Sequence, residues 1–255
     1  MRVDVLTILP GFFESPLRFG MIRSAIEKKK LKVGIHDLRS YSQDRIVDDY
    51  PYGGGAGMVL KAEPVLAAVE DLKKRNTTTL LFTPGGRTLD QRLLAGLSQK
   101  KHLLLICGRY KAIDQRVKEF IDPVLVSIGD YVLSGGEIGA LILIDGVARL
   151  LPGVLRDPDS ARTDSFSSRI LDCPYYTRPR VVRRRSVPRV LLSGNHRAIQ
   201  RWRKKASLKT TIEKRPDLLK KKSFNREEVS IILEVLHERG RLQSWRYDNR
   251  LFQDD

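Results

Sequence analysis

Short apolar runs typical of β-strands alternate with helical patterns over the first 155 residues, and this alternation limits the fold more than any other feature. Strands separated by helices usually pair in parallel and are covered on both faces. The sequence therefore predicts an α/β fold with a mostly parallel sheet. The expected strands are Val3–Leu9, Lys32–Asp37, Thr78–Thr83, Leu103–Cys107 and Val124–Ile128. The expected helices are Met21–Lys29, Glu63–Arg75, Leu89–Lys100 and Glu137–Leu151.

Two of the expected helices contain further local signals, a capping motif in one and a pair of opposite charges in the other. Thr88 and Gln91 have the spacing of a capping box at the start of the third helix. In the nearly apolar helix Glu137–Leu151, Asp145 and Arg149 are four residues apart on one face. Spacing alone favours an intrahelical salt bridge about as much as a functional role for this pair.

Three of the expected strands are followed by loops that contain glycine: Pro84-Gly85-Gly86, Gly108-Arg109-Tyr110 and Gly129-Asp130-Tyr131. Ligands of parallel sheets bind beyond the carboxyl ends of the strands, so neighbouring strands would bring these loops to one site. A single glycine after a strand is commonly only a turn. The chain contains neither G-x-G-x-x-G nor G-x-x-x-x-G-K-[ST], so the glycines do not indicate a common nucleotide-binding motif.

Composition excludes several classes of protein. The chain of 255 residues contains no stretch of about 18 uncharged apolar residues, so a membrane span is not expected. Asp4 interrupts the apolar N-terminal run, which is typical of a first strand rather than a signal peptide. Cys107 and Cys173 provide neither a disulfide framework nor a cluster of metal ligands, so no metal-ligating residues are predicted. These features favour a reducing, cytoplasmic location.

Positive charge is concentrated in the last hundred residues. From Arg156 onward there are 25 Lys plus Arg against 13 Asp plus Glu, whereas the first 155 residues carry 22 against 17. A solvated basic surface would need less asymmetry, so the charge favours a polyanionic partner. Nucleic acid is favoured over an anionic membrane, because no basic amphipathic helix stands out.

The chain divides into three predicted parts: a domain over 1–155, a linker over 156–172 and a small basic helical domain over 173–255. The linker residues have turn-forming, serine-rich composition without hydrophobic periodicity. In the basic domain the clearest helix is 226–239, with Asn225 as its N-cap, Glu228 three residues later and Gly240 to end it.

Seven motifs occur in an order that points to one family. They are DDYPYGGGAGM (48–58), ICGRYKAIDQRV (106–117), SIGDYVLSGGE (127–137), LIDGVARLLPGVL (143–155), DSF (164–166), CPYYTRP (173–179) and LLSGNHRAIQRWR (191–203). The chain closely resembles the bacterial tRNA (guanine-N1)-methyltransferase family, TrmD, of the SPOUT superfamily. The resemblance runs from the first strand to RPDLL (215–219).

The resemblance implies a deep trefoil knot in the N-terminal domain, which binds the methyl donor S-adenosylmethionine through backbone groups of the knot loops. Bare backbone at the glycines would allow the donor to approach closely. The implied donor-binding residues are Pro84, Gly108, Tyr110, Ile128, Gly129, Asp130, Tyr131, Val132, Leu133, Gly135 and Gly136.

The resemblance also implies a substrate and an assembly. The family methylates guanosine 37 of tRNA, beside the anticodon, and works as a homodimer with shared active sites. Within this chain, the implied tRNA-binding residues are Asp49, Tyr52, Ser165, Arg178, Ser193, Asn195, His196 and Arg203.

Two residues match the family's catalytic positions. N1 of neutral guanine carries a proton, so methylation needs a base, and the charge that develops on O6 needs a donor. Asp164 matches the base and Arg149 the residue that supports O6. Without the resemblance, Asp164 would be assigned to an N-cap or a local turn.

One motif departs from the family, which has GRYEGID where this chain has Lys111 and Ala112. Lys111 would bring positive charge toward a sulfonium unless it turns to solvent. Ala112 would strain the turn if that turn needs a positive φ. The family's activity depends on Mg²⁺, and loss of a carboxylate at 111 weakens a Mg²⁺ site. The alternatives are a tRNA-binding homologue with impaired catalysis and a related methyltransferase with another RNA target.

Overall fold

The computed structural model describes residues 1–157, 160 and 163–238. The chain divides into two compact units, Met1–Pro158 and Asp159–Asp255. Over the described residues, no helix has the length and apolar composition that crossing a membrane requires.

The five expected strands form one parallel sheet in the order β2-β1-β6-β5-β8, which confirms the predicted α/β class. These strands are β1 Arg2–Thr7, β2 Lys32–Asp37, β5 Thr77–Thr88, β6 His102–Ile106 and β8 Val124–Ser127. A small second sheet, which the sequence did not predict, joins β3 Asp48–Asp49, β4 Val59–Leu60 and β7 Ala112–Ile113.

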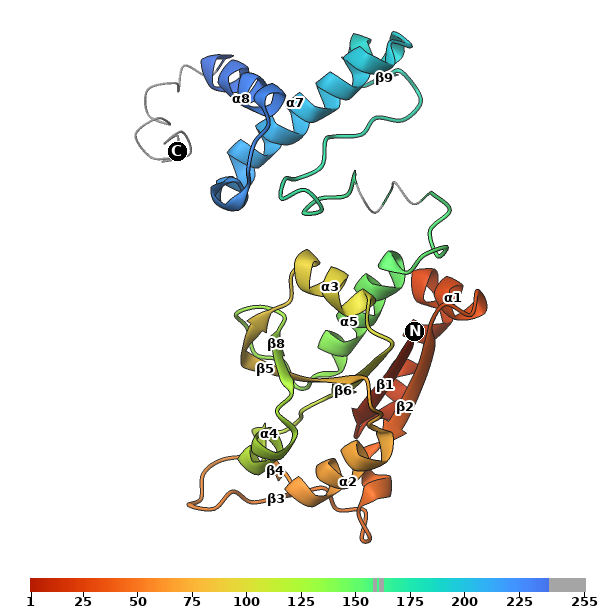
Figure 1. The fold of residues 1–255 in the computed structure, drawn as a ribbon, viewed down its shortest axis with the longest axis vertical. Coiled ribbons are helices and arrows are strands. Elements are labelled where there is room, and N and C mark those ends of the chain that lie inside the picture. The colour runs from red at the N-terminus through yellow and green to blue at the C-terminus, as the bar shows by residue number, and fades with distance from the viewer. Residues whose placement is uncertain (158–159, 161–162, 239–255) are drawn as a thin grey trace. The chain divides into compact units, whose positions relative to one another are not determined.

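Helices cover both faces of the large sheet (Figure 1). Val3 and Val5 of β1 pack into one apolar cluster with α1, α3 and α5, whereas Leu6 packs into a second cluster with α2 and α4. This alternation follows from the two-residue period of a strand. The helices of this unit are α1 Gly20–Glu27, α2 Ala62–Leu72, α3 Gln91–Ser98, α4 Gln115–Ile121 and α5 Glu137–Leu150. Short 3₁₀ helices lie at η1 Pro10–Phe13, η2 Pro16–Arg18 and η3 Leu38–Tyr41.

Two local predictions were wrong. Strand β5 does not end at Thr83 but continues to Thr88, and its pairing with β8 shifts register between Phe82 and Arg87. Because Thr88 pairs with Ser127 in the sheet, it does not cap α3. The N-cap is Asp90, whose carboxylate accepts a hydrogen bond from the Leu93 nitrogen at 2.7 Å.

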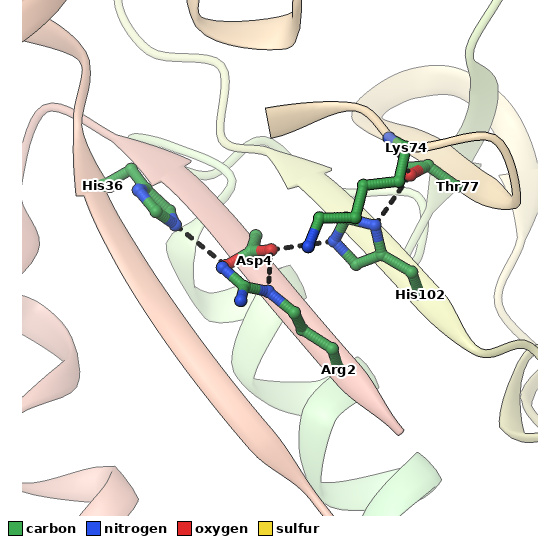
Figure 2. Close-up of polar contacts among 6 residues, drawn as sticks. All are labelled: Arg2, Asp4, His36, Lys74, Thr77 and His102. Carbon is green, nitrogen blue, oxygen red and sulfur yellow. Dashed lines mark hydrogen bonds and ion pairs between the residues drawn. The ribbon is translucent and has the colours of Figure 1, made fainter. Parts of the chain in front are cut away.

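A polar cluster joins four strands of the sheet (Figure 2). The Asp4 side chain on β1 is 1% exposed and accepts a hydrogen bond of 2.5 Å from Arg2 Nε. Asp4 also lies 2.8 Å from Nε2 of both His36 and His102, and the other ring nitrogen of His102 lies 2.7 Å from Thr77 Oγ1. Burial would raise the pKa of Asp4, but the hydrogen bonds from Arg2 and the two histidines outweigh it and lower the pKa to about 2.

The second unit is built around two helices, α7 His196–Lys214 and α8 Arg226–Glu238. The predicted cap of α8 is confirmed: the Glu228 nitrogen donates to Asn225 Oδ1 at 2.9 Å, and the Asn225 nitrogen donates to Glu228 Oε2 at 3.1 Å. The predicted end of this helix at Gly240 lies outside the described residues. The remaining elements are β9 Val181–Val182, β10 Arg185–Ser186, η4 Arg189–Leu192 and η5 Pro216–Lys221.

Part of the segment 156–172, expected as a linker, packs into the second unit. Ile170 is 7% exposed and belongs to the apolar cluster that includes Leu208 and Ile231. The Leu171 nitrogen donates to Thr211 Oγ1 of α7 at 2.9 Å. Composition suggested a linker because Phe166, Ile170 and Leu171 show no hydrophobic period among the turn formers, although burial of Ile170 is enough to anchor the chain.

Candidate active site

The expected loops after β6 and β8 meet Pro84 of β5 at one edge of the large sheet, although Pro84-Gly85-Gly86 lies within β5 and not in a loop after it. Strands β6, β5 and β8 lie side by side in parallel. The Gly136 nitrogen donates to the Gly108 carbonyl at 2.9 Å, and Arg109 forms an isolated antiparallel bridge with Gly135. The loop after β6 is therefore hydrogen-bonded to the segment that leads into α5.

These loops enclose a cavity of about 220 Å³. Apolar side chains line part of it, including Leu81, Phe82 and Val126. Of the residues expected to bind a donor, all except Asp130 line this cavity, namely Pro84, Gly108, Tyr110, Ile128, Gly129, Tyr131, Val132, Leu133, Gly135 and Gly136. Asp130 is exposed and lies outside the lining.

Two of the glycines serve contacts within the protein. A Cβ built on Gly136 would lie 2.9 Å from the Cys107 Cα, so the absence of a side chain lets the two loops approach. Gly129 has φ +147°, and its Cβ would lie 2.4 Å from the Tyr131 ring. Tyr131 is held across this turn because its hydroxyl donates to the Ile128 carbonyl at 3.0 Å. The glycines thus shape the walls of the cavity.

Glu137, the first residue of α5, follows the cavity-lining Gly136 and connects three segments. Its side chain is 1% exposed. The carboxylate accepts a hydrogen bond from Thr7 Oγ1 at 2.8 Å and pairs with Arg109 Nε at 3.2 Å. Thr7 Oγ1 in turn accepts from the Leu9 nitrogen at 2.9 Å. The carboxylate therefore holds the end of β1, the loop after β6 and the start of α5 in one arrangement.

Charge around the cavity is positive. Arg109, Lys111 and Lys118 line it, and Glu137 compensates the first of them. Lys111 is exposed, so its ammonium can reach solvent. Burial raises the pKa of the Cys107 thiol well above its usual value, which leaves this cysteine neutral. Partial burial, with Asp48 nearby, raises the pKa of Tyr110.

The strain expected at Ala112 is absent. Ala112 lies in β7, where it pairs with Val59 of β4, and it does not have a positive φ. Within this loop Tyr110 is the residue with a positive φ, +59°. The prediction failed because it treated the whole motif as a turn, whereas the motif enters a short strand two residues after Tyr110.

The two expected catalytic residues lie in different units. Arg149 is half-buried in the last turn of α5. Asp164 is half-buried in a turn, where its nitrogen donates to the Ser160 carbonyl at 3.2 Å and its carbonyl accepts from the Ser167 nitrogen at 3.2 Å. Their roles remain predictions.

The residues expected to bind tRNA are also divided between the units. Asp49 and Tyr52 are exposed on the first unit, in and just after β3. On the second unit, Ser165 is half-buried, and the exposed residues are Arg178, Ser193, Asn195, His196 and Arg203.

Two of these residues have a local structural role at the start of α7. Asn195 caps the helix by accepting from the Ala198 nitrogen at 3.1 Å. The Ser193 hydroxyl donates to the Val190 carbonyl at 2.8 Å and accepts from the Asn195 nitrogen at 3.2 Å. Such contacts explain these residue types without RNA and leave the remaining polar groups available to it.

The sequence missed Thr7, Arg109, Glu137 and Lys118 as parts of the site. Glu137 carried a usable signal, because an acidic residue at the start of a nearly apolar helix needs a partner when it is buried. The identity of that partner depends on long-range packing, which single-sequence patterns do not reveal. Among the residues that the structure describes, no group of three or more His, Cys, Asp or Glu side chains is placed to hold a metal ion.

Several known proteins share much of this sequence. A protein-family model described as tRNA (Guanine-1)-methyltransferase TrmD matches residues 1–221. A tRNA (guanine-N(1)-)-methyltransferase of Dictyoglomus turgidum is 48% identical over 93% of this chain and 98% of its own length. A protein with the same name from Carboxydothermus hydrogenoformans is 47% identical over 93% of this chain and 95% of its own length. Another, from Listeria welshimeri, is 49% identical over 86% of this chain and 92% of its own length. The chain therefore belongs to the tRNA (guanine-1)-methyltransferase TrmD family.

Proposed function

We propose that this protein transfers a methyl group from S-adenosylmethionine to N1 of guanosine 37 in tRNA. The observation that carries the proposal is the convergence of the glycine loops on one cavity, in a chain that belongs to this family over residues 1–221. The alternative of a tRNA-binding homologue without catalysis has no support among the relatives, which are named as methyltransferases.

The chemistry of the cavity suits the donor. Apolar side chains such as Leu81 and Phe82 can pack against an adenine ring, and main-chain groups of the loops can bond its edge. The expected loop residues would hold it, with Asp130 at the outside. When bound, S-adenosylmethionine supplies a methyl group on a positively charged sulfur. Exposure of Lys111 allows its charge to turn away from that sulfur, so the departure from the family motif is compatible with binding.

The protein's own residues solve two problems of the reaction. Asp164 removes the proton from N1 and so exposes the lone pair that accepts the methyl group. Negative charge then develops on O6, where Arg149 donates a hydrogen bond. Arginine suits this role because its guanidinium keeps its charge throughout.

The assembly belongs to the same proposal. The first unit contains the trefoil knot, 156–172 carries the base, and the basic helical unit holds the anticodon arm through phosphate contacts. In a homodimer, the donor loops and Arg149 come from one chain, while Asp164 and the basic unit come from the other. The substrate and the unpaired cysteines favour a cytoplasmic location.

Methyl incorporation into two tRNA transcripts tests this function. One transcript carries guanine at positions 36 and 37, and the other differs only by adenine at 37. We expect label from S-adenosylmethionine to enter the first transcript alone. Equal labelling of both would contradict the choice of position 37. The absence of label from both, with tRNA binding intact, would favour the non-catalytic alternative.

A further inference from the structure

A short hairpin in the second unit presents arginines to solvent. Strands β9 and β10 pair in antiparallel fashion, Val182 with Arg185 and Val181 with Ser186. The Val187 nitrogen donates to the Arg180 carbonyl at 2.9 Å and extends the pairing by one step. All of residues 180–186 are exposed. The hairpin therefore offers its side chains to a partner and contributes none of them to the core.

The turn of this hairpin has a conformation that arginine does not favour. Its two loop residues, Arg183 and Arg184, have φ +45° and +67°. Positive φ at both positions is the requirement of a type I′ turn, for which Asn-Gly is the strongly preferred pair. Other L-residues meet a steric penalty in this region. Stability alone does not explain two arginines here, and strain of this kind is typical of functional positions.

The arginines of the hairpin differ from three cations of α7 that pair with carboxylates. On α7, Arg201 and Lys205 pair with Glu234, and Lys204 pairs with Glu228. Within residues 163–238, no ion pair or side-chain hydrogen bond neutralises the arginines of the hairpin, which are Arg180, Arg183, Arg184 and Arg185. Three of the seven Lys and Arg side chains of α7 thus serve the fold, whereas the arginines of the hairpin are available to a ligand.

We propose that the Arg183-Arg184 hairpin is an RNA contact that grips the sugar-phosphate backbone of the tRNA independently of its sequence. This inference rests on the proposed function and adds a surface outside the residues that the family motifs imply. Guanidinium groups present paired donors that match phosphate oxygens. A turn that projects two adjacent guanidiniums can neutralise two phosphates, and each lost phosphate contact lowers the salt dependence of binding.

The test converts the turn to its preferred sequence with the double variant Arg183→Asn/Arg184→Gly. We expect its unfolding temperature to equal or exceed that of the wild type, because the strain is removed. Its Kd for tRNA should rise about tenfold at low salt, and the slope of log K against log[salt] should fall by about 1.5. The rate at saturating tRNA should remain, because the hairpin touches no reacting atom.

A control of equal charge change is Arg201→Gln/Lys205→Gln, which removes two cations that already pair with carboxylates. It should change the Kd less than twofold. Wild-type affinity and salt slope in the hairpin variant would overturn the inference. So would weaker binding with a lowered unfolding temperature, which indicates a damaged fold, or loss of binding only to anionic vesicles, which indicates a membrane contact. Failure of the proposed function would appear differently, as absence of methyl transfer by the wild type.

Discussion

At the scale of single residues, the candidate site depends on a carboxylate that does not line the cavity. Glu137 is buried, and it compensates Arg109 while accepting the Thr7 hydroxyl. Removing one partner of a buried ion pair leaves the other charge uncompensated, which costs more than the pair itself contributes. The position of two cavity loops is therefore coupled to the identity of this one side chain.

The substitution Glu137→Ala should lower the free energy of unfolding by about 3 kcal/mol, because it leaves Arg109 and Thr7 without their shared acceptor. Glu137→Gln keeps an acceptor oxygen and should cost about half as much. Denaturant unfolding measures both, and calorimetry should show weaker donor binding in the same order. Wild-type stability in the alanine variant would refute the role of Glu137.

The lowered pKa of Asp4 predicts how the stability of the fold depends on pH. Its pKa is lowered to about 2 in the folded protein, against 3.8 in the unfolded chain. A lowered pKa contributes stability that is present above pH 4 and lost as the pH falls toward 2. At neutral pH, Asp4→Asn should thus be less stable than the wild type by about 2 kcal/mol.

Below pH 4 the difference in the free energy of unfolding between the wild type and Asp4→Asn should become smaller. Urea unfolding of both proteins at several pH values measures it. The exposed residue Asp130 provides the control, since Asp130→Asn should track the wild type throughout. A difference that stayed constant from pH 7 to pH 3 would show that the charge of Asp4 is unimportant.

At the scale of elements, hydrophobic periodicity and capping residues predicted those strands and helices whose own sequences carry a clear pattern. All five main strands and the α5 and α8 helices were found from their apolar patterns. Helix α7 was missed because only Ser207, Leu208 and Thr211 are buried along its 19 residues. Its many charged residues leave no apolar period that the sequence could show. The extension of β5 to Thr88 was missed because pairing with β8, rather than propensity, keeps that segment extended.

The cap of α3 gives a direct test at this scale. Asp90→Ala removes the acceptor for the Leu93 nitrogen and should lower stability by about 1 kcal/mol. Thr88→Ala, the change that the sequence pattern alone would single out, should cost less than about 0.5 kcal/mol. Thermal unfolding of the two variants compares them. An equal or larger loss of stability in Thr88→Ala would contradict the assignment of Asp90 as the cap and favour the capping box that the sequence predicted.

At the scale of the whole molecule, the sequence predicted the cavity better than the hydrogen bonds and ion pair that join Glu137 to Thr7 and Arg109. Strand order brings the loops after β6 and β8 together with Pro84, and those two loops could be identified from their own residues, whereas Pro84-Gly85-Gly86 lies within β5. The contact between Glu137 and Thr7 joins positions 130 residues apart in the sequence, so no local pattern contains it. The charge asymmetry likewise indicated a polyanion. Only the structure separates the paired cations of α7 from the hairpin arginines, which form no ion pair within residues 163–238.

The most direct test of base-catalysed methyl transfer is the single-turnover rate of Asp164→Asn with saturating tRNA and donor. Asparagine keeps the shape of the side chain but cannot take the N1 proton. We expect the rate to fall by about 10²- to 10⁴-fold while the donor Kd stays unchanged. Asp217→Asn, an exposed change in the same unit, should retain the wild-type rate. A fall of less than about tenfold in Asp164→Asn would contradict the assignment of Asp164 as the base.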